Sequence, residues 1–152
     1  MLVEINGLDN IMSYYKYMKQ VRNRKYVSKE GREYQKLIRY HVQNYMKNDN
    51  IEIIDYPIEL KLTFYFKYRR RRDLDNCAKV IMDSLEKVLY TDDTNIYRLI
   101  CEKKMQCEKY KIIIESNKYE SHIERKEEEE QIPDIGELAI ENEVIINPAV
   151  SS

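Results

Sequence analysis

The 152-residue sequence has few of the residues that build covalent or metal-stapled frameworks. Its three cysteines, Cys77, Cys101 and Cys107, form an odd set without a Cys-x-x-Cys pair, and only His41 and His122 could join them. Such a set supports neither a disulfide framework nor a zinc site. We therefore expect three reduced thiols that serve as small apolar residues.

Long apolar runs are also missing. No window approaches the roughly 20 apolar residues that cross a bilayer, and the first residues have no basic region followed by an apolar stretch. A hydrophobic content of 43% is nevertheless too high for a wholly disordered chain. We expect a folded cytoplasmic protein of one main domain, without a membrane partner.

Charge is unevenly distributed along the chain. Lys and Arg number 26 against 27 Asp and Glu, but eight of the acids lie in residues 127–152, which contain no Lys or Arg. Residues 1–126 therefore hold 19 acids and 26 bases. This division predicts a basic, polyanion-binding domain over residues 1–126 and an acidic, flexible tail over 127–152.

Hydrophobic periodicity predicts two main helices and four strands. The polar, tyrosine-rich stretch 10–25 has no clear period, and we interpret it as a loop. The predicted order is strand, helix, strand, helix, strand, strand. These elements are a strand over 1–6, a helix over 28–48, a strand over 58–66, a helix with apolar positions from Cys77 to Leu89, and strands over 96–105 and 109–115.

Two aspartates open the second helix. If the chain is still extended there, Asp73 and Asp75 point to one side, and a divalent cation would relieve the repulsion between their carboxylates. Hard oxygen ligands of this kind suit Mg²⁺. A third carboxylate would come from Asp92 or Asp93 if the fold returns that loop to the same place. The alternative is that these are ordinary helix-capping and turn residues.

Basic side chains adjoin these carboxylates. The run Arg69, Arg70, Arg71 and Arg72 could bind a phosphodiester, or could be a solvated strand end that neutralises the acids. Lys79 lies one helical turn after Asp75, where it could meet the scissile phosphate. Its alternative is an ion pair with Asp75 or Asp83.

A second basic region precedes the first helix. Tyr14, Tyr15, Tyr17 and Tyr26 interleave with its charges, so basic groups could neutralise phosphates while aromatic faces stack on unpaired bases. The alternative is that the tyrosines belong to the core. The predicted DNA-binding residues here are Lys16, Lys19, Arg22, Arg24 and Lys25.

The segment Arg69–Asp93, RRRRDLDNCAKVIMDSLEKVLYTDD, resembles the signature of the RusA family of Holliday junction resolvases. In that family an Asp-x-Asp-Asn-x-x-Lys element opens a helix and an Asp-Asp pair follows. The segment Tyr26–Tyr34, YVSKEGREY, is similar to the family's Val-Ser-x-Glu-Gly-x-x-Tyr helix start. With the surrounding strands, the resemblance covers about residues 1–115.

This resemblance implies a RusA-like α+β fold with a small mixed β-sheet and two main helices. It also implies a homodimer that cuts four-way junctions or related branched DNA by Mg²⁺- or Mn²⁺-dependent hydrolysis, without a nucleotide cofactor. It assigns metal-binding and catalytic roles to Asp73, Asp75 and Asp93, and a catalytic role to Lys79. It also implies a bacterial cell, with a prophage or phage gene as one origin. The alternative function is a noncatalytic protein that binds branched or single-stranded DNA through the same basic residues.

Overall fold

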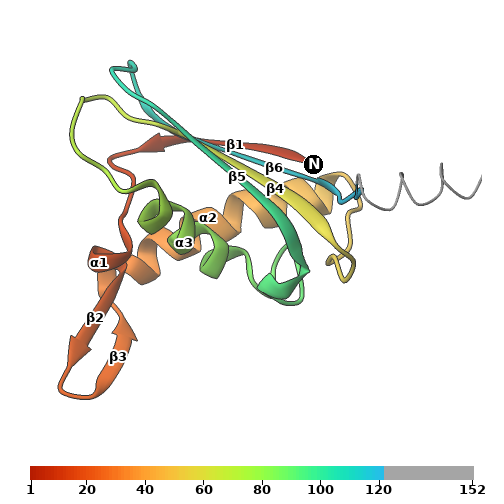
Figure 1. Ribbon diagram of the computed structural model, residues 1–152, viewed down its shortest axis with the longest axis horizontal. Helices are drawn as coiled ribbons and strands as arrows, with labels where there is room; N and C mark the ends of the chain where they lie inside the picture. The colour runs from red at the N-terminus through yellow and green to blue at the C-terminus, as the bar shows by residue number, and fades with distance from the viewer. Residues whose placement is uncertain (122–152) are drawn as a thin grey trace, which may run out of the picture. The chain divides into compact units, whose positions relative to one another are not determined.

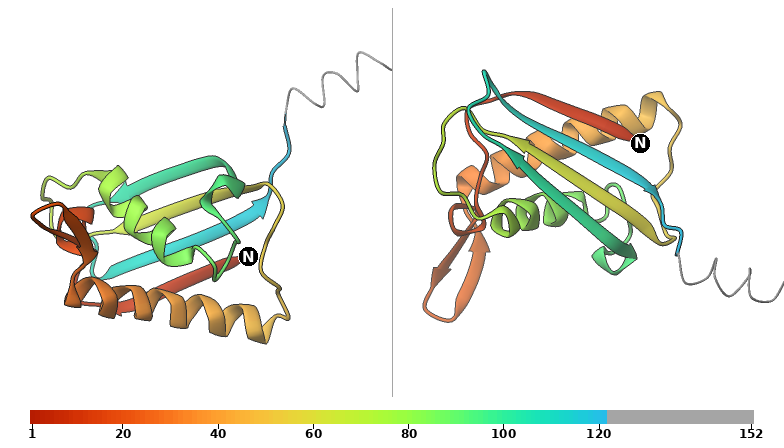
Figure 2. Two further views of the ribbon diagram at one scale, coloured as in Figure 1. Left: turned by 90° about the horizontal axis from the view of Figure 1, so that it is seen from below. Right: turned by 45° about the horizontal axis from the view of Figure 1, so that its top comes forward.

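The computed structural model of the chain describes residues 1–121, of which Met1–Tyr119 form one compact unit. Four of its strands form the main sheet, and the two long helices pack on one face of that sheet (Figure 1; Figure 2). The predicted α+β fold with a small mixed sheet is therefore confirmed. The acidic tail predicted for residues 127–152 lies outside the described residues.

The sheet has the strand order β1-β6-β4-β5, and only β4 and β5 run parallel. Along β4, Leu60, Leu62 and Phe64 are buried toward the helices, whereas Lys61 and Tyr65 alternate with them on the outer face. A parallel pair needs a crossover connection, and helix α3 provides it between β4 and β5. The strands are β1 (Leu2–Leu8), β4 (Ile58–Tyr65), β5 (Ile96–Lys104) and β6 (Tyr110–Lys118), and the crossover helix is α3 (Leu74–Leu85).

Helix α2 (Lys29–Asn48) begins and ends where its sequence pattern predicted. The Ser28 hydroxyl caps it by accepting a hydrogen bond of 2.9 Å from the backbone N–H of Gly31. Helix α3 is shorter than predicted because Glu86 is already extended and Lys87 adopts a φ of 63°. The apolar residues that follow Glu86 therefore lie in a loop and not in a further helical turn.

The loop interpretation of residues 10–25 is wrong. This stretch forms the short helix α1 (Tyr14–Tyr17) and then a two-stranded hairpin, β2 (Met18–Val21) with β3 (Arg24–Val27). The hairpin extends away from the main sheet (Figure 1). Each of its strands has four residues that are almost all exposed, so no buried face imposes an alternating pattern on the sequence.

Close backbone packing joins the base of this hairpin to the start of α2. The Ser28 N–H donates to the Tyr17 carbonyl and its hydroxyl donates to the Lys16 carbonyl, both at 2.8 Å. Gly31 lies so near that a Cβ at this position would come within 2.8 Å of the Tyr17 carbonyl oxygen. Glycine is required here by the approach of two backbones, and the contact fixes the hairpin's origin.

Two expectations from composition concern cysteine and the membrane. Cys77 is 1% exposed, and burial raises the pKa of its thiol to about 11, so it behaves as the predicted apolar core residue. Cys101 and Cys107 are free and partly buried. Within residues 1–121, no helix combines the length and the apolar character needed to cross a membrane.

Gly31→Ala is expected to lower the free energy of unfolding by about 1–3 kcal/mol, because the new methyl group meets backbone atoms that cannot move aside. In an open helix position the same change would stabilise by roughly 0.5–1 kcal/mol. Urea unfolding followed by circular dichroism measures the difference, with the exposed Gln43→Ala in the same helix as control. A stabilised Gly31→Ala protein would contradict the close contact.

Candidate active site

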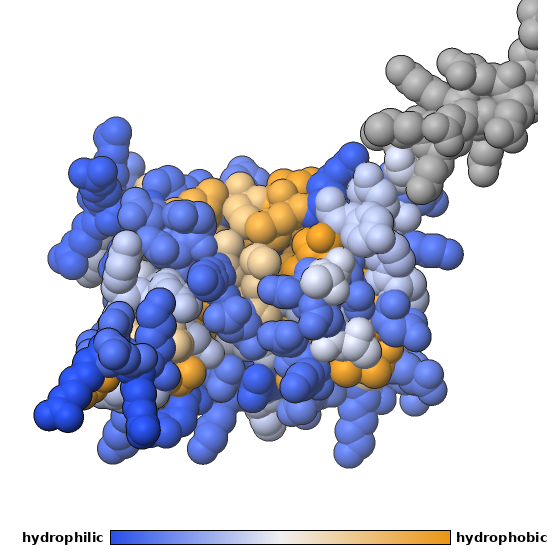
Figure 3. Space-filling model, turned by 60° about the horizontal axis from the view of Figure 1, so that its bottom comes forward, coloured by the Kyte–Doolittle hydropathy of each residue, from blue (hydrophilic) through white to orange (hydrophobic). Residues whose placement is uncertain are grey.

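One face of α3 carries a line of charged residues. Asp75, Lys79 and Asp83 follow one another at intervals of four, so they lie on the same side of the helix. With Asp93, from the short 3₁₀ turn η1 (Asp93–Asn95), they line a groove of about 550 Å³ between α3 and β5. Its remaining lining residues are Leu74, Ala78, Met82, Leu99 and Cys101. The groove therefore combines charged groups with an apolar wall, and apolar surface is visible on the helix-bearing side of the molecule (Figure 3).

The two aspartates at the start of α3 do not share a side. Asp73 is the N-cap residue but its side chain makes no capping hydrogen bond, and its carboxylate accepts one of 3.4 Å from the Asn76 amide. Asp75 is already helical, which turns it away from Asp73. Asp73 lines a neighbouring hollow together with Arg71 and Arg72. The extended geometry that the sequence allowed does not occur, because the helix begins at Leu74.

A buried tyrosine, Tyr90, holds the loop that carries Asp92 and Asp93 beside α3. The Tyr90 side chain is fully buried, and its hydroxyl donates a hydrogen bond of 2.6 Å to the Met82 carbonyl. The backbone on either side is held by Ile54, whose N–H donates to the Leu89 carbonyl at 2.8 Å and whose carbonyl accepts from the Thr91 N–H at 3.0 Å. Asp92 and Asp93 follow directly, so this tether decides that they lie beside the helix.

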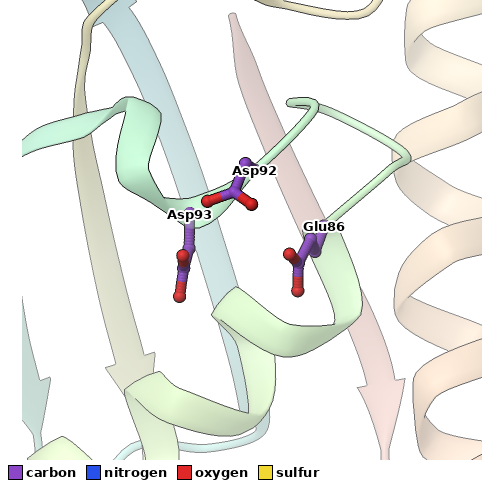
Figure 4. A group of neighbouring side chains, drawn as sticks. All are labelled: Glu86, Asp92 and Asp93. Carbon is purple, nitrogen blue, oxygen red and sulfur yellow. The ribbon is translucent and has the colours of Figure 1, made fainter.

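Three carboxylates meet at the end of α3. Oxygens of Glu86, Asp92 and Asp93 lie within 4.8 Å of one another (Figure 4). This donor set fits a hard divalent cation, which binds carboxylate oxygens. Glu86 is not among the ligands predicted from the sequence, although its position three residues after Asp83 indicates the same helix face.

The predicted ligands are thus divided between two ends of one helix. Asp75 lies in the first turn of α3, whereas Asp93 lies beside Glu86, just beyond its last turn. Twelve helical residues rise about 18 Å. The structure brings Asp75 and Asp93 to one groove and Asp73 to the adjoining hollow, but within residues 1–121 the close carboxylate group contains only Asp93 of the three.

The electrostatics of the groove reflect this concentration of acids. Partial burial raises the pKa of Asp83, and the charges of Glu86 and Asp93 raise it further, while Lys79 opposes the shift. Asp92 behaves oppositely, because the Thr94 backbone N–H donates to its carboxylate at 2.8 Å and lowers its pKa. The end of the groove therefore favours an added positive charge.

Lys79 does not form the ion pair that was its alternative interpretation. Its Nζ lies 4.3 Å from the centroid of the Tyr14 ring, in a cation–π contact. Within residues 1–121, every ion pair shorter than 4.0 Å or at that limit joins strands of the sheet, and none involves Lys79 or the arginine run. These pairs are Lys61–Glu115, Arg98–Glu59 and Lys111–Glu4.

The arginine run is an exposed basic surface beside Asp73. Arg69, Arg70 and Arg71 are exposed. Arg72 is partly buried, donates to the Asn10 side chain at 3.3 Å, and has its guanidinium 5.9 Å from the Phe66 ring centroid. Since none of these arginines pairs with a carboxylate inside the described chain, their charge is available to an external anion.

The tyrosines of the hairpin region include both predicted kinds, core residues and exposed rings that could stack on bases. Tyr17 is 2% exposed and accepts a hydrogen bond of 2.9 Å from Gln35, so it is a core residue. Tyr15 and Tyr26 are 76% and 49% exposed and can offer ring faces to a ligand. All five basic residues predicted to bind DNA are exposed around them, and the hairpin side of the molecule is strongly hydrophilic (Figure 3). These are Lys16, Lys19, Arg22, Arg24 and Lys25.

Tyr90→Phe is expected to lower the free energy of unfolding by about 0.5–1.5 kcal/mol, because the hydrogen bond from the Tyr90 hydroxyl is lost while the Met82 carbonyl keeps the Glu86 N–H as its other donor, at 3.2 Å. Tyr97→Phe, which removes a hydroxyl from an exposed side chain, serves as the matched control. Denaturant titrations of both variants give the comparison. Equal stability of the Tyr90→Phe and unmodified proteins would show that the hydroxyl does not tether the loop.

Asp83→Asn is expected to raise the free energy of unfolding at pH 7 by less than about 1 kcal/mol, since the half-exposed side chain is screened by solvent. The raised pKa means that folding favours the protonated acid, so stability falls as pH rises from the ordinary value of 3.8 through the folded-state pKa. The amide removes that loss. The gain should vanish at about pH 3, where the acid is protonated in both states; a constant difference across urea titrations at several pH values would refute it.

Comparisons with known proteins agree with this arrangement. The family model described as endodeoxyribonuclease RusA matches residues 13–116, which span the hairpin, both long helices and most of the sheet. A crossover junction endodeoxyribonuclease RusA from Escherichia coli is 34% identical over 89 residues, or 56% of this chain and 71% of that protein. Proteins of the same name from Shigella sonnei and Enterobacteria phage 82 are 33% and 32% identical with the same coverage. The chain therefore belongs to the endodeoxyribonuclease RusA family, as the resemblance of residues 69–93 predicted.

Proposed function

We propose that this protein is a Mg²⁺-dependent endodeoxyribonuclease that resolves Holliday junctions or related branched DNA by phosphodiester hydrolysis. The observation that carries the proposal is the groove in which Asp75, Asp83 and Asp93 line the same space as an ammonium group, Lys79. Acidic groups beside basic ones suit a cation together with an anionic backbone. Family membership and the names of the relatives support the same reaction.

Carboxylates at both ends of α3 supply the oxygen donors. In this proposal Asp73, Asp75 and Asp93 hold one or two Mg²⁺ or Mn²⁺ ions, and Asp92 and Glu86 add donors beside Asp93. Their spread along the helix favours two positions over one. A divalent cation held by these residues would supply a water molecule of lowered pKa and would stabilise charge on the phosphate.

The basic side chains orient the DNA in this proposal. Lys79 meets the scissile phosphate from within the groove, while Arg72 and the exposed arginines before it bind neighbouring phosphates. The basic hairpin neutralises a further stretch of backbone. Residues 1–126 would then form the whole nuclease domain, acting in the cytoplasm of a bacterial cell.

A junction resolvase must cut two strands, whereas each chain offers one groove of this kind within residues 1–121. We therefore infer a homodimer, in which a second copy supplies the second site and both cuts fall within one complex. A twofold axis would relate the two grooves, matching two DNA strands of opposite polarity.

Asp75→Asn is expected to slow cutting of a labelled four-way junction at least about 100-fold, because it removes a carboxylate from the groove. Junction binding should stay within about threefold, since binding depends mainly on the basic residues. Single-turnover cleavage in Mg²⁺ and in Mn²⁺, with EDTA as a blank, measures the first quantity. Gel-shift titration in Ca²⁺ measures the second.

Asp55→Asn is the matched control, because Asp55 is exposed and precedes β4, outside the residues that line the groove. It should cut at the unmodified rate. Full activity of the Asp75→Asn protein would contradict the assignment of this groove as the active site. Tight junction binding by the unmodified protein without cutting, in either metal, would favour the noncatalytic DNA-binding alternative.

A further inference from the structure

The contact between Tyr14 and Lys79 joins two parts of the molecule that are far apart in the sequence. Tyr14 is the first residue of α1, at the base of the hairpin, and Lys79 lies in the middle of α3. Helix α1 packs against both α2 and α3. Lys79 Nζ lies 4.3 Å from the Tyr14 ring centroid, the shortest cation–π distance within residues 1–121.

The Tyr14 ring also contacts a second tyrosine, Tyr17, which is fixed in the core. Its centroid lies 6.4 Å from that of Tyr17, which is buried and accepts a hydrogen bond from Gln35 of α2. The backbone of Tyr17 is itself fixed by the Ser28 N–H at 2.8 Å. The Tyr14 ring therefore contacts a buried, hydrogen-bonded tyrosine as well as the ammonium of Lys79.

Lys79 has acidic alternatives that it does not use. Asp75 and Asp83 lie one turn before it and one turn after it on the same helix face, and both line the groove. No carboxylate of residues 1–121 lies within 4.0 Å of its ammonium. An ion pair with either aspartate would neutralise the cation that should meet phosphate, and one with Asp75 would also occupy a carboxylate that should meet metal.

We propose that Tyr14 is a positioning residue for Lys79: its ring face holds the ammonium over the groove and away from the aspartates. The inference rests on the proposed nuclease function and extends it to a residue outside the acidic groups. A ring face attracts a cation without neutralising it, so the full charge of Lys79 remains for the scissile phosphate. Because Tyr14 begins the segment that carries the basic hairpin, the same contact links the hairpin to the site of hydrolysis.

The first measurement reports the contact itself, without DNA. Protein labelled with ¹³C-lysine gives a signal for the methylene group beside each ammonium, and the signal lost in Lys79→Arg identifies Lys79. The ring should shift this signal upfield in the unmodified protein and in Tyr14→Phe, which keeps the ring. The shift should disappear in Tyr14→Leu and Tyr14→Met, which keep apolar bulk beside Tyr17. An unchanged signal in both nonaromatic variants would overturn the proposal.

The second measurement is single-turnover cutting of a four-way junction at saturating protein. Tyr14→Leu and Tyr14→Met should each cut about fivefold more slowly, the size expected when a cation–π contact of moderate strength is lost. Tyr14→Phe should retain most of the rate, and junction affinity should change less than twofold in all three. Tyr40→Leu, at an exposed tyrosine of α2, controls for general effects of removing a ring.

The outcomes separate this inference from the function on which it rests. Equal rates of the unmodified and nonaromatic proteins would remove the role of Tyr14 while leaving the nuclease intact. A matched loss of rate and of junction affinity would also overturn it, because it would make Tyr14 a DNA-binding or folding residue. A failure of the unmodified protein to cut branched DNA in Mg²⁺ or Mn²⁺ would remove the nuclease function, and the positioning role with it.

Discussion

The crossover from β4 through α3 to β5 depends on the burial of Tyr90. The loop after α3 contains Lys87 in a left-handed conformation, which is unfavourable for a residue other than glycine. It also contains two adjacent aspartates, whose charges do not favour packing against the rest of the protein. Tyr90 offsets this by filling an interior position and donating its hydroxyl to the Met82 carbonyl near the helix end. The backbone of Ile54 closes the other side. Through these bonds an internal side chain sets the position of the external carboxylates beside α3.

Charges in this molecule are used in two different ways. On the outer face of the sheet, opposite charges pair across neighbouring strands, as Lys111 does with Glu4 and Arg98 with Glu59. Around α3 the charges stay unpaired within the described chain, although acids and bases lie close together there. The pKa of Asp83 is raised there, first by partial burial and then by the charges of Glu86 and Asp93. Unpaired groups at this density are unfavourable in the free protein, and a bound cation or phosphate would relieve their repulsion, as the proposed function requires.

Helix α1 connects the hairpin to the groove, because it precedes β2 in the chain and packs against α3. Tyr17 anchors α1 in the core, Gly31 lets its backbone approach α2, and Tyr14 extends from the same turn to Lys79. These three residues thus have separate roles in packing, in close backbone approach and in contact with a charged side chain. DNA bound by the exposed Lys and Arg side chains of the hairpin would therefore lie next to the acidic groove. No hinge motion between the hairpin and the groove would be needed.

The sequence by itself determined the two helices, the buried strand β4 and the family, because these depend on local periodicity and on a contiguous motif. The capping of α2 by Ser28 and the acidic opening of α3 are equally local. Tertiary structure alone decided the rest. The hairpin left no pattern since it buries neither face, and α3 ended early because Lys87 turns the chain. The grouping of Glu86 with Asp92 and Asp93, and the separation of Asp75 from them, followed from a loop whose path is set by contacts with Ile54, more than thirty residues earlier in the chain. Such contacts join residues whose spacing carries no periodic signal, so only the folded chain reveals which carboxylates meet.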